Sequence, residues 1–162
     1  MKYDLATMED LNEIMDLERA GFNKEEAGSE EVYKDRINKL HDTFLTIKND
    51  SGKLIGFVVG PAVKKRFVQD EMYDDTPLNL SQGGHQLIFT IAISPNYRGR
   101  GIGSKLLSEF ENIARKNHRE SIALTCLEGK IPFYEKNGFA DQGVSASSHG
   151  NEIWYNMEKI IN

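Results

Sequence analysis

Two arginines and three glycines stand close together in the segment RGRGIG, residues 98–103, which joins an apolar run to a helix-like pattern. Glycine is unfavourable at the start of a helix unless the backbone turns sharply or another group comes very close to it. The free N–H groups and the macrodipole of a helix N-terminus attract anions, and Arg98 and Arg100 add positive charge there. These residue types indicate a phosphate-binding turn. The hexapeptide alone is equally compatible with a glycine-rich turn that carries two solvated arginines.

The spacing of these glycines does not match two other phosphate-binding motifs. The sequence has no GxxxxGK[ST] segment, and no early GxGxxG is followed by an acidic residue after the next strand. No group of histidine, cysteine or carboxylate residues has metal-ligand spacing, so no metal site is expected. Cys126 is the one cysteine, and a single chain therefore cannot form a disulfide or a CxxC redox pair. We interpret it as a small buried hydrophobe rather than a nucleophile.

The elements that must position this turn follow from the hydrophobic pattern. The strongly apolar run 85–94 predicts a buried central strand that Pro95 ends, because proline cannot donate to a strand ladder. An amphipathic helix is predicted over about 101–117, followed by a buried strand over 121–127 and a short helix within 129–139. The other predicted strands lie at 2–7, 43–50, 53–63, 139–146 and 151–160, and the other helices at 8–22 and 29–40.

Length and composition restrict the class of protein. The chain has 162 residues, 39% hydrophobic and 28% charged, which suits one soluble domain over 1–162. A net charge of −5 argues against a nucleic-acid partner, because such proteins usually present a basic face. The N-terminus has no apolar signal core, and the longest apolar run is too short to cross a bilayer. We therefore expect a cytoplasmic protein that contacts no membrane.

Residues 98–103 resemble the R/Q-x-x-G-x-G/A signature with which the GNAT superfamily of N-acetyltransferases binds the pyrophosphate of acetyl-CoA. The preceding IAISPNYRG and the helix that follows match as well, and FYEKNGF, residues 133–139, resembles the family's aromatic-Tyr…Gly-Phe segment. The resemblance implies an α/β fold with a single mixed, splayed sheet of about seven strands, flanked by about four helices.

Within the superfamily, the chain resembles most the arylalkylamine N-acetyltransferases and their bacterial relatives. GFVVGP, GGHQ, PFYEKNGF and GVSASSHG carry this likeness. The animal enzymes have two histidines on the central strand, implicated in taking the proton of the amine, whereas the matching positions here hold Leu87 and Phe89. The general base and a preference for aromatic amines therefore do not follow from the resemblance.

The resemblance implies that an amine attacks the thioester of acetyl-CoA directly, without an acyl-enzyme. Backbone groups of the central strand would bind the oxyanion. Tyr134 would protonate the leaving thiolate, because a phenol with a pKa of about 10 keeps its proton at neutral pH. His85 is a candidate general base by its ordinary pKa, and an ordinary strand-end histidine is equally compatible. The residues expected at acetyl-CoA are Ile91, Ala92, Ile93, Arg98, Gly99, Arg100, Gly101, Ile102, Gly103, Ser104 and Tyr134.

The expected function is acetyl-CoA-dependent N-acetylation of a primary amine on a small molecule. An acetyltransferase for protein or peptide N-terminal amines is the alternative, and an acyl-CoA-binding regulatory module without turnover is a third. The long polar segment 64–84 would cover the acceptor side, as functional lids often do, and it favours a small closed site. Tyr134 argues against the module, because binding alone does not need it. Pairing of two copies through the last strands stays open, as do the identity of the amine and the acyl-chain preference.

Overall fold

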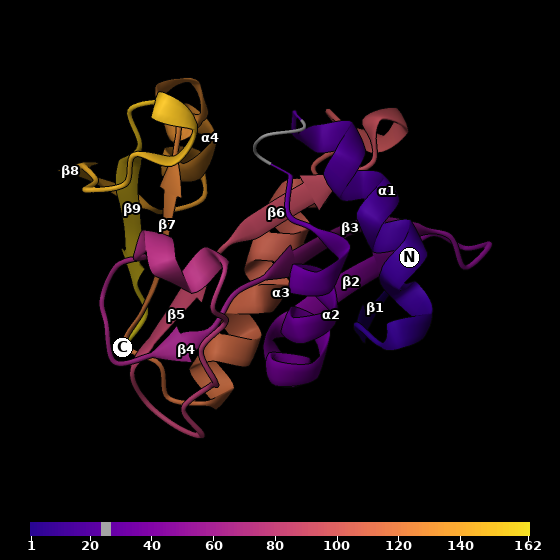
Figure 1. Ribbon diagram of the computed structural model, residues 1–162, viewed down its shortest axis with the longest axis horizontal. Helices are drawn as coiled ribbons and strands as arrows, with labels where there is room; N and C mark the ends of the chain where they lie inside the picture. The colour runs from indigo at the N-terminus through magenta and orange to yellow at the C-terminus, as the bar shows by residue number, and fades with distance from the viewer. Residues whose placement is uncertain (24–26) are drawn as a thin grey trace.

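The computed structural model describes residues 1–23 and 27–162 (Figure 1). Within these residues, nine strands form two sheets and four α-helices pack around them. The strands are β1 (Lys2–Leu5), β2 (Phe44–Lys48), β3 (Leu54–Val59), β4 (Ala62–Val63), β5 (His85–Ile88), β6 (Thr90–Ile93), β7 (Ser121–Cys126), β8 (Ala140–Val144) and β9 (Tyr155–Ile160). The helices are α1 (Leu11–Gly21), α2 (Glu30–Lys39), α3 (Ile102–Lys116) and α4 (Ile131–Lys136).

The predicted central strand is divided between the two sheets. The first sheet has the order β1-β2-β3-β6 and is antiparallel throughout. The second has the order β4-β5-β7-β9-β8, in which β5 and β7 are parallel. The predicted mixed α/β fold with four helices is confirmed. The expected single sheet of about seven strands needs correction, because the run 85–94 changes sheets at Phe89 and 53–63 contains two strands.

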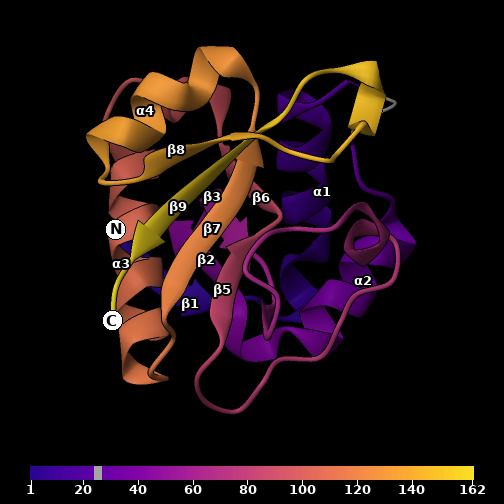
Figure 2. The same cartoon turned by 90° about the vertical axis from the view of Figure 1, so that its left-hand side faces the viewer.

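Helix α3 packs across both sheets on one side. Phe110 of α3 is fully buried in a core that includes Val58 of β3 and Leu124 of β7. Helices α1 and α2 cover the opposite face of the first sheet around Phe57, and segment 64–84 covers the opposite face of the second. Figure 2 shows this layering, with α3 on the left and α1 and α2 on the right. The predicted lid is therefore one outer layer of the fold.

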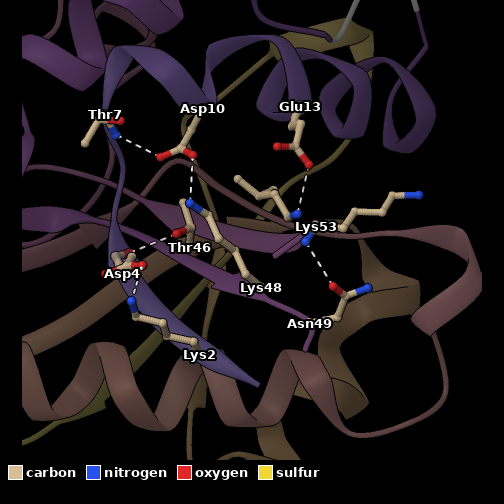
Figure 3. A network of polar contacts seen from close by, with 10 residues as sticks. Lys2, Asp4, Thr7, Asp10, Glu13, Thr46, Lys48, Asn49 and Lys53 are labelled. Carbon is tan, nitrogen blue, oxygen red and sulfur yellow. Dashed lines mark hydrogen bonds and ion pairs between the residues drawn. The ribbon is translucent and has the colours of Figure 1, made fainter. Parts of the chain in front are cut away.

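Polar contacts hold the start of α1 to the first sheet (Figure 3). Thr7 donates its backbone N–H to Asp10 Oδ2 at 3.0 Å, and Asp10 Oδ1 lies 3.0 Å from Lys48 Nζ. The Glu13 carboxylate accepts a hydrogen bond from the backbone N–H of Leu54 at 2.9 Å. These bonds join the first turns of the helical segment to strands β2 and β3.

Candidate functional site

The candidate site begins where the central strand breaks. Strand β5 pairs with β7 from Ser121 to Leu124, whereas β6 pairs with β3 on the other sheet. Strand β7 continues through Thr125 and Cys126 after its pairing with β5 has ended. Strands β6 and β7 therefore diverge, as Figure 1 shows. Strand β6 is left with one edge that pairs with no strand among the described residues.

Gly60 and Gln86, from the segments GFVVGP and GGHQ, lie beside this break. Gly60 lies against strand β5, since a Cβ built on it would stand 1.9 Å from the carbonyl oxygen of Leu87. The Gln86 side chain, 1% exposed, donates Nε2 to the carbonyl oxygens of Gly60 and Leu87, each at 2.9 Å. The Leu87 N–H donates to Pro61 at 2.8 Å. Residues 59–63 thus stay paired with 85–90 on the edge away from β7, and the register shifts by one residue between the pair Ala62–Gln86 and the pair Val59–Thr90, as at a β-bulge.

The free edge of β6 presents backbone groups of alternate residues. In an antiparallel ladder, every second residue directs its N–H and C=O toward the same neighbour. The carbonyl oxygen of Ile93 accepts a hydrogen bond from Arg98 Nε at 3.2 Å, so it faces away from β3. Ile91, two residues earlier, faces the same way, while Ala92 is directed toward Phe57 of β3. Of the three residues predicted on this strand, Ile91 and Ile93 offer free N–H groups.

The predicted phosphate-binding turn adopts the backbone that its glycines permit. Gly99 and Gly101 have φ of 75° and 78°, the left-handed region, and a Cβ on either would meet nothing within 4 Å. Gly101 caps α3 without a side-chain hydrogen bond, and the first bond inside the helix joins Lys105 N to Gly101 O at 3.1 Å. The N–H groups of Ile102, Gly103 and Ser104 therefore have no partner within the helix.

The residues around this turn make different contacts. The Arg98 guanidinium ties the turn to β6 through Ile93, and that of Arg100 lies 5.0 Å from the centre of the Tyr97 ring. Gly103 serves packing, because a Cβ there would stand 3.1 Å from the Phe133 ring of α4. The structure thus brings both predicted motifs together, the turn at 98–103 and the α4 segment.

Tyr134 of α4 lies at the end of β7. Its side chain is 7% exposed, with its ring 5.8 Å from that of Phe139 in an edge-on contact. Burial raises the pKa of Tyr134, and the nearby Cys126 and Tyr73 raise it further. Burial also raises the pKa of the Cys126 thiol to about 11. Both groups keep their protons at neutral pH.

An aromatic group that the sequence did not predict lies on the opposite side of the break. The Tyr73 ring stands 5.0 Å from that of Phe89 and is stacked on His149 at 5.7 Å. The Tyr73 hydroxyl is 3.3 Å from Thr125 Oγ1 near the end of β7. Trp154 Nε1 donates to the carbonyl oxygen of His149 at 2.7 Å. No local spacing relates these residues, which come from three separate segments.

The segment 64–84 is tied firmly to the rest of the site. Two guanidinium nitrogens of Arg66, Nε and Nη2, contact the carboxylate of Glu158, which is buried in the second sheet; Nε lies 2.6 Å from Oε2. Asp70 Oδ1 accepts a hydrogen bond from Ser147 Oγ at 2.6 Å. Segment 64–84 is thus joined to the second sheet and to the β8–β9 connection.

The structure does not bring His85 to this site. Its Nδ1 lies 2.7 Å from Ser121 Oγ, and its Nε2 lies 3.5 Å from the Glu120 carboxylate. Ser121 begins β7 and Cys126 ends it, so these two residues are roughly 16 Å apart at about 3.3 Å per residue. His85 and Tyr134 therefore lie at opposite ends of the strand.

The described ranges 1–23 and 27–162 contain neither a metal-ligating cluster nor a membrane-spanning helix. No group of three or more histidine, cysteine or carboxylate residues there could hold a metal ion. No helix there combines the length and the apolar character that a membrane span requires.

The comparison with known proteins agrees with what the geometry of the site indicates. The model of the Acetyltransferase (GNAT) family matches residues 10–139. The chain is similar to glucosamine 6-phosphate N-acetyltransferase 1 of Dictyostelium discoideum, at 29% identity over 69% of this chain and 66% of that protein. It thus spans just under two thirds of that relative. Serotonin N-acetyltransferase of Mesocricetus auratus is 26% identical over 94% of this chain and 73% of its own length.

A solved structure shows the same fold over the full length. The GphF GNAT-like decarboxylase in complex with isobutyryl-CoA superposes with a TM-score of 0.84 and covers 100% of both chains, at 13% identity. At this identity the likeness concerns the fold alone. That protein is named a decarboxylase, so activity must be argued from the residues of this chain.

Proposed function

Because the chain belongs to the acetyltransferase (GNAT) family, we propose that it transfers the acetyl group of acetyl-CoA to a primary amine of a small molecule. The observation that carries this proposal is the free edge of β6 beside the uncapped N-terminus of α3. Acetyl-CoA has a pyrophosphate at one point and amide and thioester groups farther along an extended arm. A helix N-terminus next to an unpaired strand edge suits both parts.

The pyrophosphate would bind at the turn 98–101 and the start of α3. The N–H groups of Ile102, Gly103 and Ser104 supply donors, and the helix macrodipole adds partial positive charge. A phosphate can approach the turn closely because Gly101 carries no side chain and its surroundings are open. Arg100 adds a full charge, while the bond from Arg98 to β6 holds the turn in place.

The reacting end of the co-substrate would lie between β6 and the end of β7. Acetyl-CoA supplies a thioester, whose carbonyl carbon is attacked by the neutral amine. The carbonyl oxygen gains negative charge, and the nitrogen releases its extra proton to solvent. The N–H group of Ile91 or Ile93 is positioned on the free edge to donate to that oxygen. The Tyr134 hydroxyl would give its proton to the departing sulfur, and its raised pKa keeps this proton available at neutral pH. His85 receives no role in this mechanism, because it lies at the other end of β5.

The contacts on the acceptor side favour a small amine as the substrate over the N-terminus of a protein. A peptide requires a groove in which several residues can lie extended. Here the contacts of Arg66 with Glu158 and of Asp70 with Ser147 connect segment 64–84 to the second sheet and to the β8–β9 connection. These contacts favour a compact acceptor over an extended chain.

The test is release of free thiol from acetyl-CoA with arylalkylamines, polyamines, amino sugars and short peptides. We expect turnover with one class of small amine. The Tyr134→Phe variant should lower kcat about a hundredfold, as loss of a general acid does, with acetyl-CoA affinity in calorimetry unchanged. Tyr3→Phe on β1 makes the same chemical change far from the site and should retain activity. Turnover with peptides alone would replace the proposed substrate, and tight acetyl-CoA binding without any turnover would favour the regulatory module.

A further inference from the structure

The two arginines of the turn before α3 are held in different ways. The Arg98 guanidinium is already bound, because its Nε donates to the carbonyl oxygen of Ile93 at 3.2 Å. It also reaches the end of α1, where its Nη2 lies 3.9 Å from the position that a Cβ on Gly21 would take. The Arg100 guanidinium lies over the Tyr97 ring, 5.0 Å from its centre, and makes no hydrogen bond or ion pair with any described residue. Arg100 is therefore the arginine of this turn whose N–H groups are available to a ligand.

The contact with the Tyr97 ring prepares Arg100 for binding. A guanidinium attracted to the face of an aromatic ring uses no hydrogen bond in that contact, so its N–H groups stay available. An arginine that is already held in place also loses less conformational entropy when it binds a ligand. Arg100 directly precedes Gly101, the N-cap of α3, so a phosphate at the N–H groups of this helix start lies within reach of its side chain. The ring thus holds a positive charge at the turn in advance of any ligand.

Tyr97 is itself held by a residue from the first sheet. Its hydroxyl accepts a hydrogen bond from Asn49 Nδ2 at 3.1 Å, although the two residues are 48 apart in the sequence. Asn49 Oδ1 accepts from the backbone N–H groups of Ser51 and Lys53, at 3.1 and 2.9 Å, and Figure 3 shows the bond from Lys53. These two bonds fix the orientation of the amide, since only its NH2 end is left to face the hydroxyl. The β2–β3 turn thus supports the ring over which Arg100 lies.

Packing is the simpler explanation for Tyr97, whose half-buried ring lies against the core shared by α3 and both sheets. Packing alone requires neither the bond from Asn49 to the hydroxyl nor a cation over the ring. A packing residue affects the stability of the fold. A positioning residue affects the binding of the phosphate-bearing part of a ligand, which can be measured by itself.

We propose that Tyr97 and Asn49 are positioning residues for the donor substrate, because they hold the Arg100 guanidinium where the pyrophosphate of acetyl-CoA would bind. In this arrangement Arg98 joins the turn to β6, and Arg100 supplies the charge that the ligand meets. The inference rests on the proposed function, since it requires that acetyl-CoA binds at this turn. The three residues then act together on the phosphate groups of the donor and leave its pantetheine arm unaffected.

The experiment measures the affinity of two ligands. CoA is titrated by calorimetry, and pantetheine, which has the same arm without phosphate groups, is titrated by NMR. Arg100→Gln should weaken CoA binding at least about tenfold, because it removes a charge-assisted contact with phosphate. Tyr97→Leu, which removes the ring, should weaken CoA binding about fivefold. None of these changes should alter pantetheine binding.

Smaller substitutions test the support of the ring. Tyr97→Phe and Asn49→Ala remove only the bond to the hydroxyl, and each should weaken CoA binding about threefold. Any other change in the β2–β3 turn should have at most this effect. The two changes together should weaken binding no more than either alone, and Tyr97→Leu should add less than about twofold to Arg100→Gln. Tyr97→Phe and Asn49→Ala keep the test valid if Tyr97→Leu does not fold.

The two arginines should respond differently to the same substitution. Arg98→Gln keeps a side-chain N–H that can donate to the Ile93 carbonyl, so it should weaken CoA binding less than Arg100→Gln does. Lys116→Gln is the matched control, because it removes an exposed cation at the opposite end of α3 and should leave CoA affinity unchanged. Tyr3→Phe removes a hydroxyl from β1 and should also have no effect.

The outcomes separate this inference from the proposed function. CoA binding that Arg100→Gln weakens, but that Tyr97→Leu and Asn49→Ala leave unchanged, would overturn the inference and keep the proposed function. Equal losses of CoA and pantetheine binding in Tyr97→Leu would assign the ring to packing and overturn it in the same way. The expected pattern of CoA affinities, without thiol release from acetyl-CoA with any amine, would support the positioning residues and contradict the transferase function. A wild-type protein that binds neither ligand would overturn both.

Discussion

The two sides of the free β6 edge are built in different ways. On the side proposed for acetyl-CoA, the turn 98–101 and the start of α3 form one continuous segment, and their donors are backbone groups. On the side proposed for the acceptor, the wall joins residues that are far apart in the sequence, such as Asp70 with Ser147, 77 residues apart, and Arg66 with Glu158, 92 apart. The comparison indicates that the two sides can be changed independently, except where the break itself is formed.

The largest effect is expected at Gly60, where both sides depend on the same backbone. In Gly60→Ala, the new Cβ would stand 1.9 Å from the Leu87 carbonyl oxygen, which belongs to the backbone and cannot move aside. We expect a loss of roughly 3 kcal/mol or more in the free energy of unfolding, measured by urea denaturation. Gly129→Ala, whose Cβ would meet nothing within 4 Å, is the matched control. Equal stability of the two variants would contradict the account of the break.

The next largest effect should be confined to the acetyl-CoA side. Gly101→Val places a side chain where the pyrophosphate must approach, and we expect acetyl-CoA affinity in calorimetry to fall at least about a hundredfold. Gly52→Val is a close control, because Gly52 also has a positive φ, 82°, and open surroundings, but lies in the β2–β3 turn. Both variants carry the same backbone strain, so only Gly101→Val should lose binding. Unchanged affinity in Gly101→Val would contradict the assigned turn.

A smaller effect should appear on the acceptor side alone. Asp70→Ala removes the carboxylate that accepts from Ser147, and we expect the KM for the amine to rise about fivefold while the KM for acetyl-CoA stays constant. A double-mutant cycle with Ser147→Ala should show a coupling energy of about 0.5 kcal/mol or more. Asp75→Ala, an exposed carboxylate in the same loop, serves as the control. A parallel rise in both KM values would mean that the two sides are not independent.

The smallest effect is expected at Cys126, between the two sides. Its thiol is buried and its pKa is raised to about 11, so the reactive thiolate is scarce at neutral pH. We expect Cys126→Ala to keep kcat within about threefold of the wild type, and the wild-type thiol to react slowly with iodoacetamide. An acetylated Cys126 found by mass spectrometry during turnover would instead establish a covalent route.

Much of the fold could be predicted because it follows from local signals. The apolar periodicity placed all four helices, and the glycine spacing marked the turn whose positive φ angles at Gly99 and Gly101 the structure contains. The break at Phe89 could not be predicted in this way, since the apolar residues run on both sides of it and only Thr90 interrupts them between 87 and 93. It coincides with a one-residue shift in the pairing of 85–93 with 56–63, which no periodicity within the run reports.

The sequence by itself determined the parts of this protein whose contacts are close along the chain. The αL turn, the uncapped start of α3 and the amphipathic faces belong to this class, because helix starts and tight turns depend on the residues that form them. Only the tertiary structure decided which side chains gather at the acceptor side. Tyr73, Phe89 and His149 come from three separate segments, and their rings meet because the long loop and the β8–β9 connection are held together over the second sheet. Such contacts depend on how sheets pack, which spacing along one chain does not encode.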